Sequence, residues 1–212
     1  MGLFTSLKKL FSKSSKVSIL VVGLDNSGKS TLINYLKPAP QKQLDIAPTV
    51  GFSTEEFSVL GMKVTCFDMS GQGKYRNLWE DYYKQVNAII FVVDASDKLR
   101  LAVAKEELRI LLEGLENSKF GSRSASSLTN SGPSSVKNQN KNQNKFTILF
   151  LANKMDKPGS ASAIECADIM ELNSLLNNVE WRIDETDCLT GLGVDEAVKW
   201  LAENIKRQGK MV

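Results

Sequence analysis

The strongest chemical pattern in the chain is a glycine-rich segment, residues 23–30, which reads G-L-D-N-S-G-K-S. It fits G-x-x-x-x-G-K-[ST] and lies between an apolar run and a helical pattern, as a phosphate-binding loop requires. In such a loop the backbone N–H groups converge on phosphate oxygens, the lysine neutralises the β- and γ-phosphates, and the last hydroxyl binds Mg²⁺. The candidate nucleotide-binding residues here are Gly23, Asp25, Asn26, Ser27, Gly28, Lys29, Ser30 and Thr31, with Ser30 also a candidate metal ligand.

A second polar segment, N-K-M-D at residues 153–156, follows a buried apolar run. Alone, N-K-x-D is a weak tetrapeptide that is more often a polar turn. Downstream of a phosphate-binding loop, its carboxylate can accept the N1–H and 2-amino hydrogens of guanine, a pair that adenine lacks. Asn153, Lys154 and Asp156 are therefore candidate contacts for guanine. The two segments together predict a GTP-binding domain.

Residues that could hold a metal ion and a water molecule lie between these two segments, in D-M-S-G-Q at residues 68–72. Asp68 can hold a water of Mg²⁺, the N–H of Gly71 can meet the γ-phosphate, and Gln72 can orient the attacking water. Thr49 is the candidate second metal ligand from the protein. Gln72 is the candidate catalytic residue.

The elements that must position these residues alternate along the chain. Near-continuous apolar runs, which suit parallel strands buried on both faces, alternate with helical spacings of leucine. The predicted strands cover residues 17–22, 52–57, 62–67, 88–93 and 146–152, and the predicted helices cover 29–36, 101–115 and 194–205. This order predicts an α/β fold with ligands at the carboxyl ends of the strands.

Composition limits the chemistry further. A chain of 212 residues, 42% of them hydrophobic and 24% charged, fits one globular domain, and no apolar run approaches the about 20 residues that span a bilayer. The chain has no histidine, which excludes His-based triads and His-ligated metal sites. Cys66, Cys166 and Cys188 are far apart and odd in number, as expected for reduced thiols in the cytoplasm.

Positive charge is concentrated in two stretches. Residues 1–24 carry four lysines and no acid, and residues 118–145 carry five basic residues and no acid. Since the net charge is only +3, the rest of the chain is acidic, which argues against a nucleic-acid partner. The second stretch is rich in Ser, Asn, Gln and Lys, and we interpret residues 118–145 as a low-complexity insertion between a helix and a strand.

The motifs G-L-D-x-x-G-K, P-T-V-G-F, D-M-S-G-Q and N-K-M-D, in this order, resemble those of the Arf and Arf-like family of small GTPases. The run F-D-M-S-G-Q-G-K-Y-R-N-L-W-E-D-Y-Y at residues 67–83 is more specific. It resembles the branch of the family whose active form recruits the BBSome coat for ciliary membrane traffic. The resemblance covers nearly all of the chain, except for the insertion and part of the N-terminal tail.

This resemblance implies a P-loop G domain, residues 17–212, with a mostly parallel six-stranded sheet flanked by helices. It implies slow hydrolysis of GTP to GDP, with Mg²⁺ as cofactor and with an exchange factor and a GTPase-activating protein as partners. A BBSome subunit is the implied effector. The implied location is the cytoplasm and the membrane periphery, at the ciliary base or ciliary membrane.

The resemblance also assigns residues. The family's guanine-supporting loop, usually T-C-A, aligns with T-D-C here, which implies base contacts from Asp187 and from the backbone N–H of Cys188. Phe52, Phe67 and Tyr82 align with the aromatic triad that effectors of the family contact, and Phe67 replaces the tryptophan common at its position.

The N-terminal tail carries a membrane-binding pattern. Five apolar side chains share one face of a helix with lysines elsewhere around it: Leu3, Phe4, Leu7, Leu10 and Phe11. M-G-L-F-T-S also fits the pattern for myristoylation of Gly2, and because one myristoyl chain binds membrane only marginally, the helix would supply a second signal. We expect an amphipathic membrane-binding helix over residues 1–16. A helix packed on its own domain is the alternative, and the two can hold in different nucleotide states.

The predicted function is an Arf-like GDP/GTP switch that associates with membrane in its GTP state and recruits an effector. The alternatives are a GTP-dependent membrane scaffold with negligible hydrolysis, and an Arf-like regulator of non-ciliary vesicle traffic. Gln72 favours hydrolysis, whereas Asp25, where many small GTPases carry glycine, is expected to crowd the γ-phosphate and slow it. A nucleotide kinase is disfavoured by N-K-M-D and by the lack of an arginine-rich lid.

Overall fold

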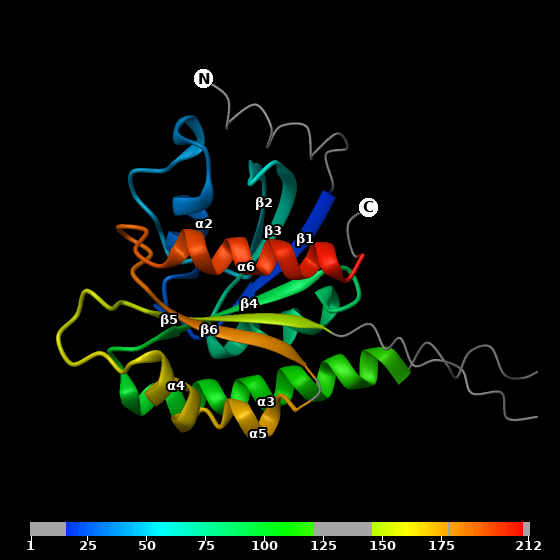
Figure 1. Ribbon diagram of the computed structural model, residues 1–212, viewed down its shortest axis with the longest axis vertical. Coiled ribbons are helices and arrows are strands. Elements are labelled where there is room, and N and C mark those ends of the chain that lie inside the picture. The colour runs from blue at the N-terminus through cyan, green and yellow to red at the C-terminus, as the bar shows by residue number, and fades with distance from the viewer. Residues whose placement is uncertain (1–15, 121–145, 178, 210–212) are drawn as a thin grey trace, which may run out of the picture.

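The computed structural model describes residues 16–120, 146–177 and 179–209, which form a central sheet covered by helices (Figure 1). The strands are β1 (Lys16–Val22), β2 (Phe52–Val59), β3 (Met62–Met69), β4 (Ala88–Asp94), β5 (Thr147–Asn153) and β6 (Glu180–Thr186). They lie in the order β2-β3-β1-β4-β5-β6, and β2 pairs antiparallel to β3 while the other neighbours are parallel. The predicted α/β class with a mostly parallel six-stranded sheet is confirmed.

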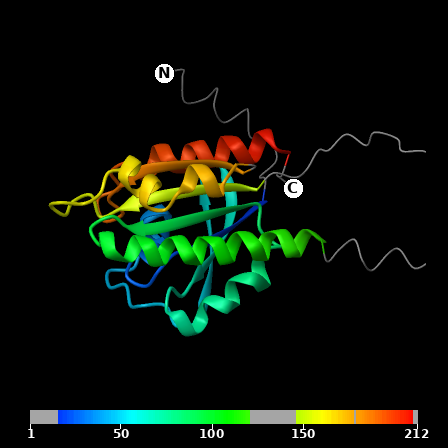
Figure 2. The same cartoon turned by 90° about the horizontal axis from the view of Figure 1, so that it is seen from below.

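The helices divide between the two faces of the sheet. Two of them, α2 (Lys29–Leu36) and α6 (Val194–Arg207), pack on one face over a buried apolar cluster. The other face is covered by α3 (Lys98–Phe120), α4 (Ala163–Ile169), α5 (Leu172–Leu175) and the 3₁₀ segment η2 (Gly73–Tyr82). Figure 2 shows α3 and α6 on opposite sides of the sheet. A short 3₁₀ turn, η1 (Ala39–Gln41), follows α2.

The central strands are buried because their residues are apolar on both faces. Every residue of β5 is buried, as is every residue of β4 except Asp94 at its end. Because these strands are packed on both faces, as in the core of a parallel sheet, they form a rigid platform. Because β1, β3, β5 and β6 run parallel, the segments that follow them meet at the carboxyl-terminal end of the sheet. These segments carry the predicted site residues.

Most predicted boundaries differ from the structure by a few residues, and two of these differences change how a segment is interpreted. Strand β3 extends to Met69, so Asp68 lies within the strand and not after it. Helix α3 extends to Phe120, so residues 118–120, placed in the insertion by the sequence, are helical; Leu115 is buried and the Ser118 hydroxyl donates to its carbonyl oxygen at 2.8 Å, which continues the last turn.

Two sequence predictions lie outside the described residues. They are residues 1–15 of the predicted N-terminal amphipathic helix, with Gly2, and the insertion from residue 121 onward; Lys16, the last residue of that predicted helix, instead begins β1. Within the residues that the structure does describe, no helix is both long enough and apolar enough to cross a membrane.

Candidate functional site

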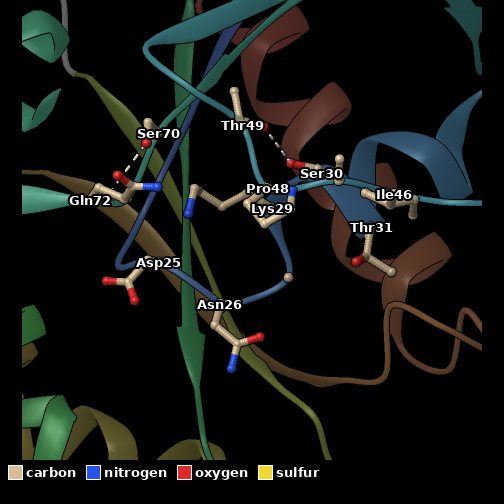
Figure 3. Close-up of a pocket in the computed structure, with 13 residues that line it drawn as sticks. Asp25, Asn26, Lys29, Ser30, Thr31, Ile46, Pro48, Thr49, Ser70 and Gln72 are labelled. Atoms are coloured by element: carbon tan, nitrogen blue, oxygen red, sulfur yellow. Dashed lines mark hydrogen bonds between the residues drawn. The ribbon is translucent and has the colours of Figure 1, made fainter.

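The glycine-rich loop joins β1 to α2 and forms one wall of a cleft of about 430 Å³, opposite residues 46–49 and 70–72 (Figure 3). Its glycines are required by its shape. Gly23 and Gly28 have φ values of 136° and 102°, where a side chain is strained, and a Cβ would collide with the carbonyl oxygen of Val92 or with the side-chain amide of Asn153. The predicted loop residues that line this cleft are Asp25, Asn26, Gly28, Lys29, Ser30 and Thr31, whereas Gly23 and Ser27 are buried and do not line it.

Lys29 supplies the positive charge of the cleft. Its side chain is only 6% exposed, and its Nζ donates to the carbonyl oxygen of Leu24 at 2.7 Å. Burial lowers the pKa of Lys29 to about 8, although the nearby carboxylate of Asp68 favours the charged form. An anion in the cleft would stabilise this ammonium group further, so the site is suited to phosphate.

Three oxygen-bearing side chains meet beside the loop and form a candidate magnesium site. The Ser30 hydroxyl donates to Asp68 Oδ2 at 2.6 Å, the Thr49 hydroxyl donates to the same oxygen at 3.0 Å, and the two hydroxyl oxygens lie 2.9 Å apart. Burial raises the pKa of Asp68, and the hydrogen bonds from Ser30 and Thr49 oppose this. The other oxygen, Oδ1, is buried and has no hydrogen-bond partner among the described residues. Hard oxygen donors with an unused carboxylate oxygen fit Mg²⁺.

Gln72 faces the same cleft. It is half-buried, and its backbone N–H donates to the Ser70 hydroxyl at 3.4 Å (Figure 3). The preceding residue, Gly71, packs directly against the backbone of Leu24 and Asp25, so closely that a Cβ would collide with it. Glycine is therefore required at this point, and its backbone borders the phosphate-binding loop.

A second pocket, of about 270 Å³, adjoins the loop on the side of β5 and β6. All the residues predicted to contact guanine line it: Asn153, Lys154, Asp156, Asp187 and Cys188. The Asp156 side chain is exposed, so its carboxylate is accessible to a ligand. Lys154 has a positive φ of 72°, and its Nζ forms an ion pair with Asp94 Oδ2 at 2.7 Å, which fixes the backbone turn between Asn153 and Asp156.

Asn153 joins the two pockets. Its Nδ2 donates to the carbonyl oxygen of Ser27 at 2.8 Å, and its Oδ1 accepts the backbone N–H of Cys188 at 2.9 Å. The Asp187 carboxylate accepts bonds from within its own loop, from the N–H of Leu189 and the hydroxyl of Thr190, at 2.9 and 2.6 Å. Contacts of Asp187 and Cys188 with a base stay predictions, and in this structure the Cys188 N–H is bonded to Asn153.

The sequence analysis missed two arginines that reach the loop. Arg100 on α3 contacts the Asp25 carboxylate at 2.5 Å, and Arg76 in η2 lies 3.7 Å from the same oxygen. Arg100 is far from Asp25 in sequence, and the spacing of α3 marks only its buried leucines, so no local signal identifies this contact. Asp94, the partner of Lys154, was missed for the same reason.

The three aromatic residues that were predicted to contact effectors, Phe52, Phe67 and Tyr82, lie together. The Tyr82 ring lies between the others, with ring centroids 5.4 Å from Phe52 and 4.7 Å from Phe67. Phe52 is 47% exposed, whereas Phe67 and Tyr82 are partly buried against the core. Phe67 directly precedes Asp68 in β3, so the two side chains point to opposite faces of the sheet, whereas Phe52 lines a pocket together with Ser30, Thr49 and Asp68.

A glycine-rich loop between a strand and a helix, a hydroxyl–carboxylate cluster beside it and a polar pocket at the ends of the last two strands define a P-loop nucleotide-binding protein of the small-GTPase type. Comparison with known proteins defines the class further. The model of the ADP-ribosylation factor family matches residues 3–121 and 134–205. The chain therefore belongs to the ADP-ribosylation factor family, and it is a GTP hydrolase that binds GTP and GDP with Mg²⁺. The interruption of the match falls inside the predicted insertion.

Individual relatives agree with this assignment. The chain is 42% identical to ADP-ribosylation factor-like protein 6 of Danio rerio over 207 residues, which cover 97% of this chain and 98% of the relative. It is 38% identical to the protein of the same name from Caenorhabditis elegans over 208 residues, 98% of this chain and 96% of the relative. Among solved structures, the Arl6 BBS3 small GTPase of Trypanosoma brucei with the bound nucleotide analogue GppNp matches with a TM-score of 0.73 and 38% identity, covering 92% of this chain and 99% of that chain.

Proposed function

We propose that the GTP-bound chain associates with a membrane and recruits a BBSome subunit, in membrane protein traffic at the ciliary base or ciliary membrane. The observation that carries the proposal is the position of Phe52, which lines a pocket together with Ser30, Thr49 and Asp68 of the candidate magnesium site. Phe67 precedes Asp68, and Phe52 lies three residues after Thr49. A change at the γ-phosphate can therefore reach the aromatic surface through very few residues. The named relatives and the resemblance of residues 67–83 support the choice of effector.

The phosphate end of the site has a proposed role for each group. Lys29 neutralises the β- and γ-phosphates, while Ser30 and Thr49 are ligands of Mg²⁺ and Asp68 holds it through a water molecule. Bound Mg²⁺ supplies charge neutralisation at the phosphates. Gln72 orients the attacking water from its place on the cleft wall.

The base end is proposed to select guanine. Asp156 accepts the two guanine donors, Lys154 is held beside the base by Asp94, and Asn153 keeps the pocket wall joined to the phosphate-binding loop. Two observations support this: Asn153, Lys154 and Asp156 line one pocket, and Lys154 Nζ lies 2.7 Å from Asp94 Oδ2.

The effector surface can be tested by pull-down with purified BBSome. The chain loaded with GppNp should retain the complex, and the GDP-loaded chain should not. Phe52→Ala should weaken retention about tenfold, since the exposed ring contributes contact area without supporting the core. Ile164→Ala on α4, also an exposed apolar residue, is the matched control and should leave retention unchanged. Equal retention of both nucleotide forms would reject the proposal, and no retention of either would favour an Arf-like regulator of non-ciliary traffic.

Membrane association can be tested separately by liposome flotation. The full chain should float with GTP and not with GDP, and deletion of residues 2–13 should abolish flotation without changing nucleotide binding. These residues lie outside the described part of the chain, so the prediction comes from the sequence pattern. Gly2→Ala separates acylation from the helix, because it removes only the acceptor for myristate. Flotation that is equal with GDP and GTP would contradict the proposed coupling.

A further inference from the structure

Asp25 places a carboxylate in a loop that must bind phosphate anions. Asp25 lines the cleft together with Lys29 and Gln72. The sequence alone predicts that Asp25 crowds the γ-phosphate and slows hydrolysis, and a free carboxylate turned toward the γ-phosphate would also repel it. The structure shows a different arrangement, because the Asp25 carboxylate points away from the side of the cleft where Lys29 lies (Figure 3).

Arg100 on α3 holds the carboxylate in this direction. Its Nη2 donates to Asp25 Oδ1 at 2.5 Å, and its Nη1 donates to the Asp25 carbonyl oxygen at 3.2 Å. One guanidinium group therefore fixes both the side chain and the backbone of Asp25. Lysine could not reproduce this, since its single ammonium group lacks the planar fork of donors.

Arg76 in η2 contacts the same carboxylate from another direction. Its Nη2 lies 3.7 Å from Asp25 Oδ1, its Nε donates to the Gly71 carbonyl oxygen at 2.8 Å, and its Nη1 bonds Glu107 on α3 at 2.5 Å. Burial alone would raise the pKa of Asp25, but the bond to Arg100 and the charges of both arginines lower it overall. Asp25 is therefore ionised at neutral pH and bound to two cations.

We propose that Arg100, supported by Arg76, is a positioning residue that holds the Asp25 carboxylate away from the γ-phosphate, so that the loop accepts GTP as well as GDP. The inference rests on the proposed phosphate cradle of Lys29 and Ser30. GDP has no γ-phosphate, so the release of Asp25 should penalise GTP selectively. This selectivity distinguishes positioning of a charge from general support of the loop.

The test is a charge-rescue experiment with three variants of the full chain: Arg100→Ala, Arg100→Ala combined with Asp25→Asn, and Arg109→Ala. Arg109 lies on the same helix, is 54% exposed and pairs only within that helix in the described structure, with Glu106, so it is the matched control. The affinities for GDP and for GppNp are measured by competition with a fluorescent nucleotide, in Mg²⁺.

In Arg100→Ala the ratio of GppNp to GDP affinity should fall about tenfold, since a carboxylate within a few ångströms of the γ-phosphate costs on the order of one tenfold step in binding. The added Asp25→Asn should restore the ratio to within about twofold, because the repelling charge is gone. Arg109→Ala should match the parent.

An unchanged ratio of GppNp to GDP affinity in Arg100→Ala would overturn the proposal. A reduced ratio that Asp25→Asn does not restore would also overturn it, because Arg100 would then only support the loop. Failure of the underlying cradle is a separate outcome. It would appear as an unchanged GDP affinity in Lys29→Ala. This measurement is independent of the ratio of GppNp to GDP affinity in the arginine variants.

Discussion

Replacement of Asn153 by alanine should loosen the nucleotide site from both of its sides. Asn153 is 3% exposed, and its amide bridges the phosphate-binding loop and the loop after β6, through Ser27 and Cys188. Alanine leaves a buried carbonyl oxygen and a buried N–H without these partners. The amide of Asn153 also lies where a Cβ at Gly28 would be, so the substitution opens space under the loop.

The magnitude follows from these two bonds. Loss of a buried partner costs about 1–3 kcal/mol for each unsatisfied group, so we expect a loss of roughly 3 kcal/mol in the free energy of unfolding. For a chain of this size, this corresponds to a fall of about 6–12 °C in the midpoint of thermal unfolding. Nucleotide affinity should fall as well, because both loops that border the nucleotide lose a fixed position.

The assay is urea unfolding over a series of GDP concentrations. Ligand linkage adds RT ln(1 + [GDP]/Kd) to the stability, so extrapolation to zero GDP gives the intrinsic stability and the dependence on GDP gives Kd. Asn204→Ala is the matched control: Asn204 is 2% exposed and also bonds through its side chain, to the Trp200 carbonyl oxygen and to Arg207, but it lies on α6 away from the pockets.

Asn204→Ala should lower stability without weakening GDP binding, whereas Asn153→Ala should lower both. The reasoning is refuted if the two variants have the same Kd for GDP, or if the free energy of unfolding of Asn153→Ala at zero GDP lies within about 1 kcal/mol of the parent, which corresponds to no more than one hydrogen bond.

Three further predictions concern single groups. Asp156→Asn should weaken GTP binding by roughly 1–3 kcal/mol and shift preference toward xanthine nucleotides, measured by calorimetry, because the carboxylate that accepts two guanine donors is lost; an unchanged GTP affinity would remove Asp156 from this role. Gln72→Leu should keep nucleotide binding and stall hydrolysis in single-turnover assays with an activating protein, and equal stimulated turnover would contradict the catalytic assignment. Burial alone would raise the pKa of Asp94, but the hydrogen bond and charge of Lys154 and the bonds from Ser96 lower it overall. The ion pair therefore stabilises the fold above about pH 4, and this stabilisation is lost as the pH falls through the lowered pKa, so Asp94→Asn should flatten the acid side of the stability profile.

The elements that the sequence predicts best are those with the most apolar patterns. The predicted helix at 29–36 coincides with α2, and the predicted strand at 88–93 ends one residue before β4 does. Strand β6 was not located because its sequence, E-W-R-I-D-E-T, is polar and mostly half-buried at the edge of the sheet. Helices α4 and α5 have seven and four residues, too short for a helical period to stand out.

The residues of the candidate site also differ in how well the sequence predicts them. Residues held by backbone shape, such as those of the glycine-rich loop, have a sequence signature because the loop needs glycine at fixed positions. Contacts between side chains from distant segments have none: the Asp25–Arg100 pair spans 75 residues and the Asp94–Lys154 pair spans 60. The sequence alone therefore predicts that Asp25 crowds the γ-phosphate, without the arginine contacts that hold its carboxylate.

The placement of β2 explains how a phosphate could influence the aromatic surface. Among the described strands β2 lies at the edge of the sheet and pairs with β3 alone, and Lys37 at the end of α2 bonds Glu55 in the middle of β2 at 2.9 Å. Lys37 is almost fully buried, so loss of this pair would leave a buried charge, and β2 is thereby held in one register against α2 and β3. Thr49, just before this strand, contacts the candidate magnesium site, and Phe52 begins the strand. A change in the bond between Thr49 and Asp68 would reach Phe52 through residues 50 and 51 alone, and Phe52 is where the exposed aromatic surface starts.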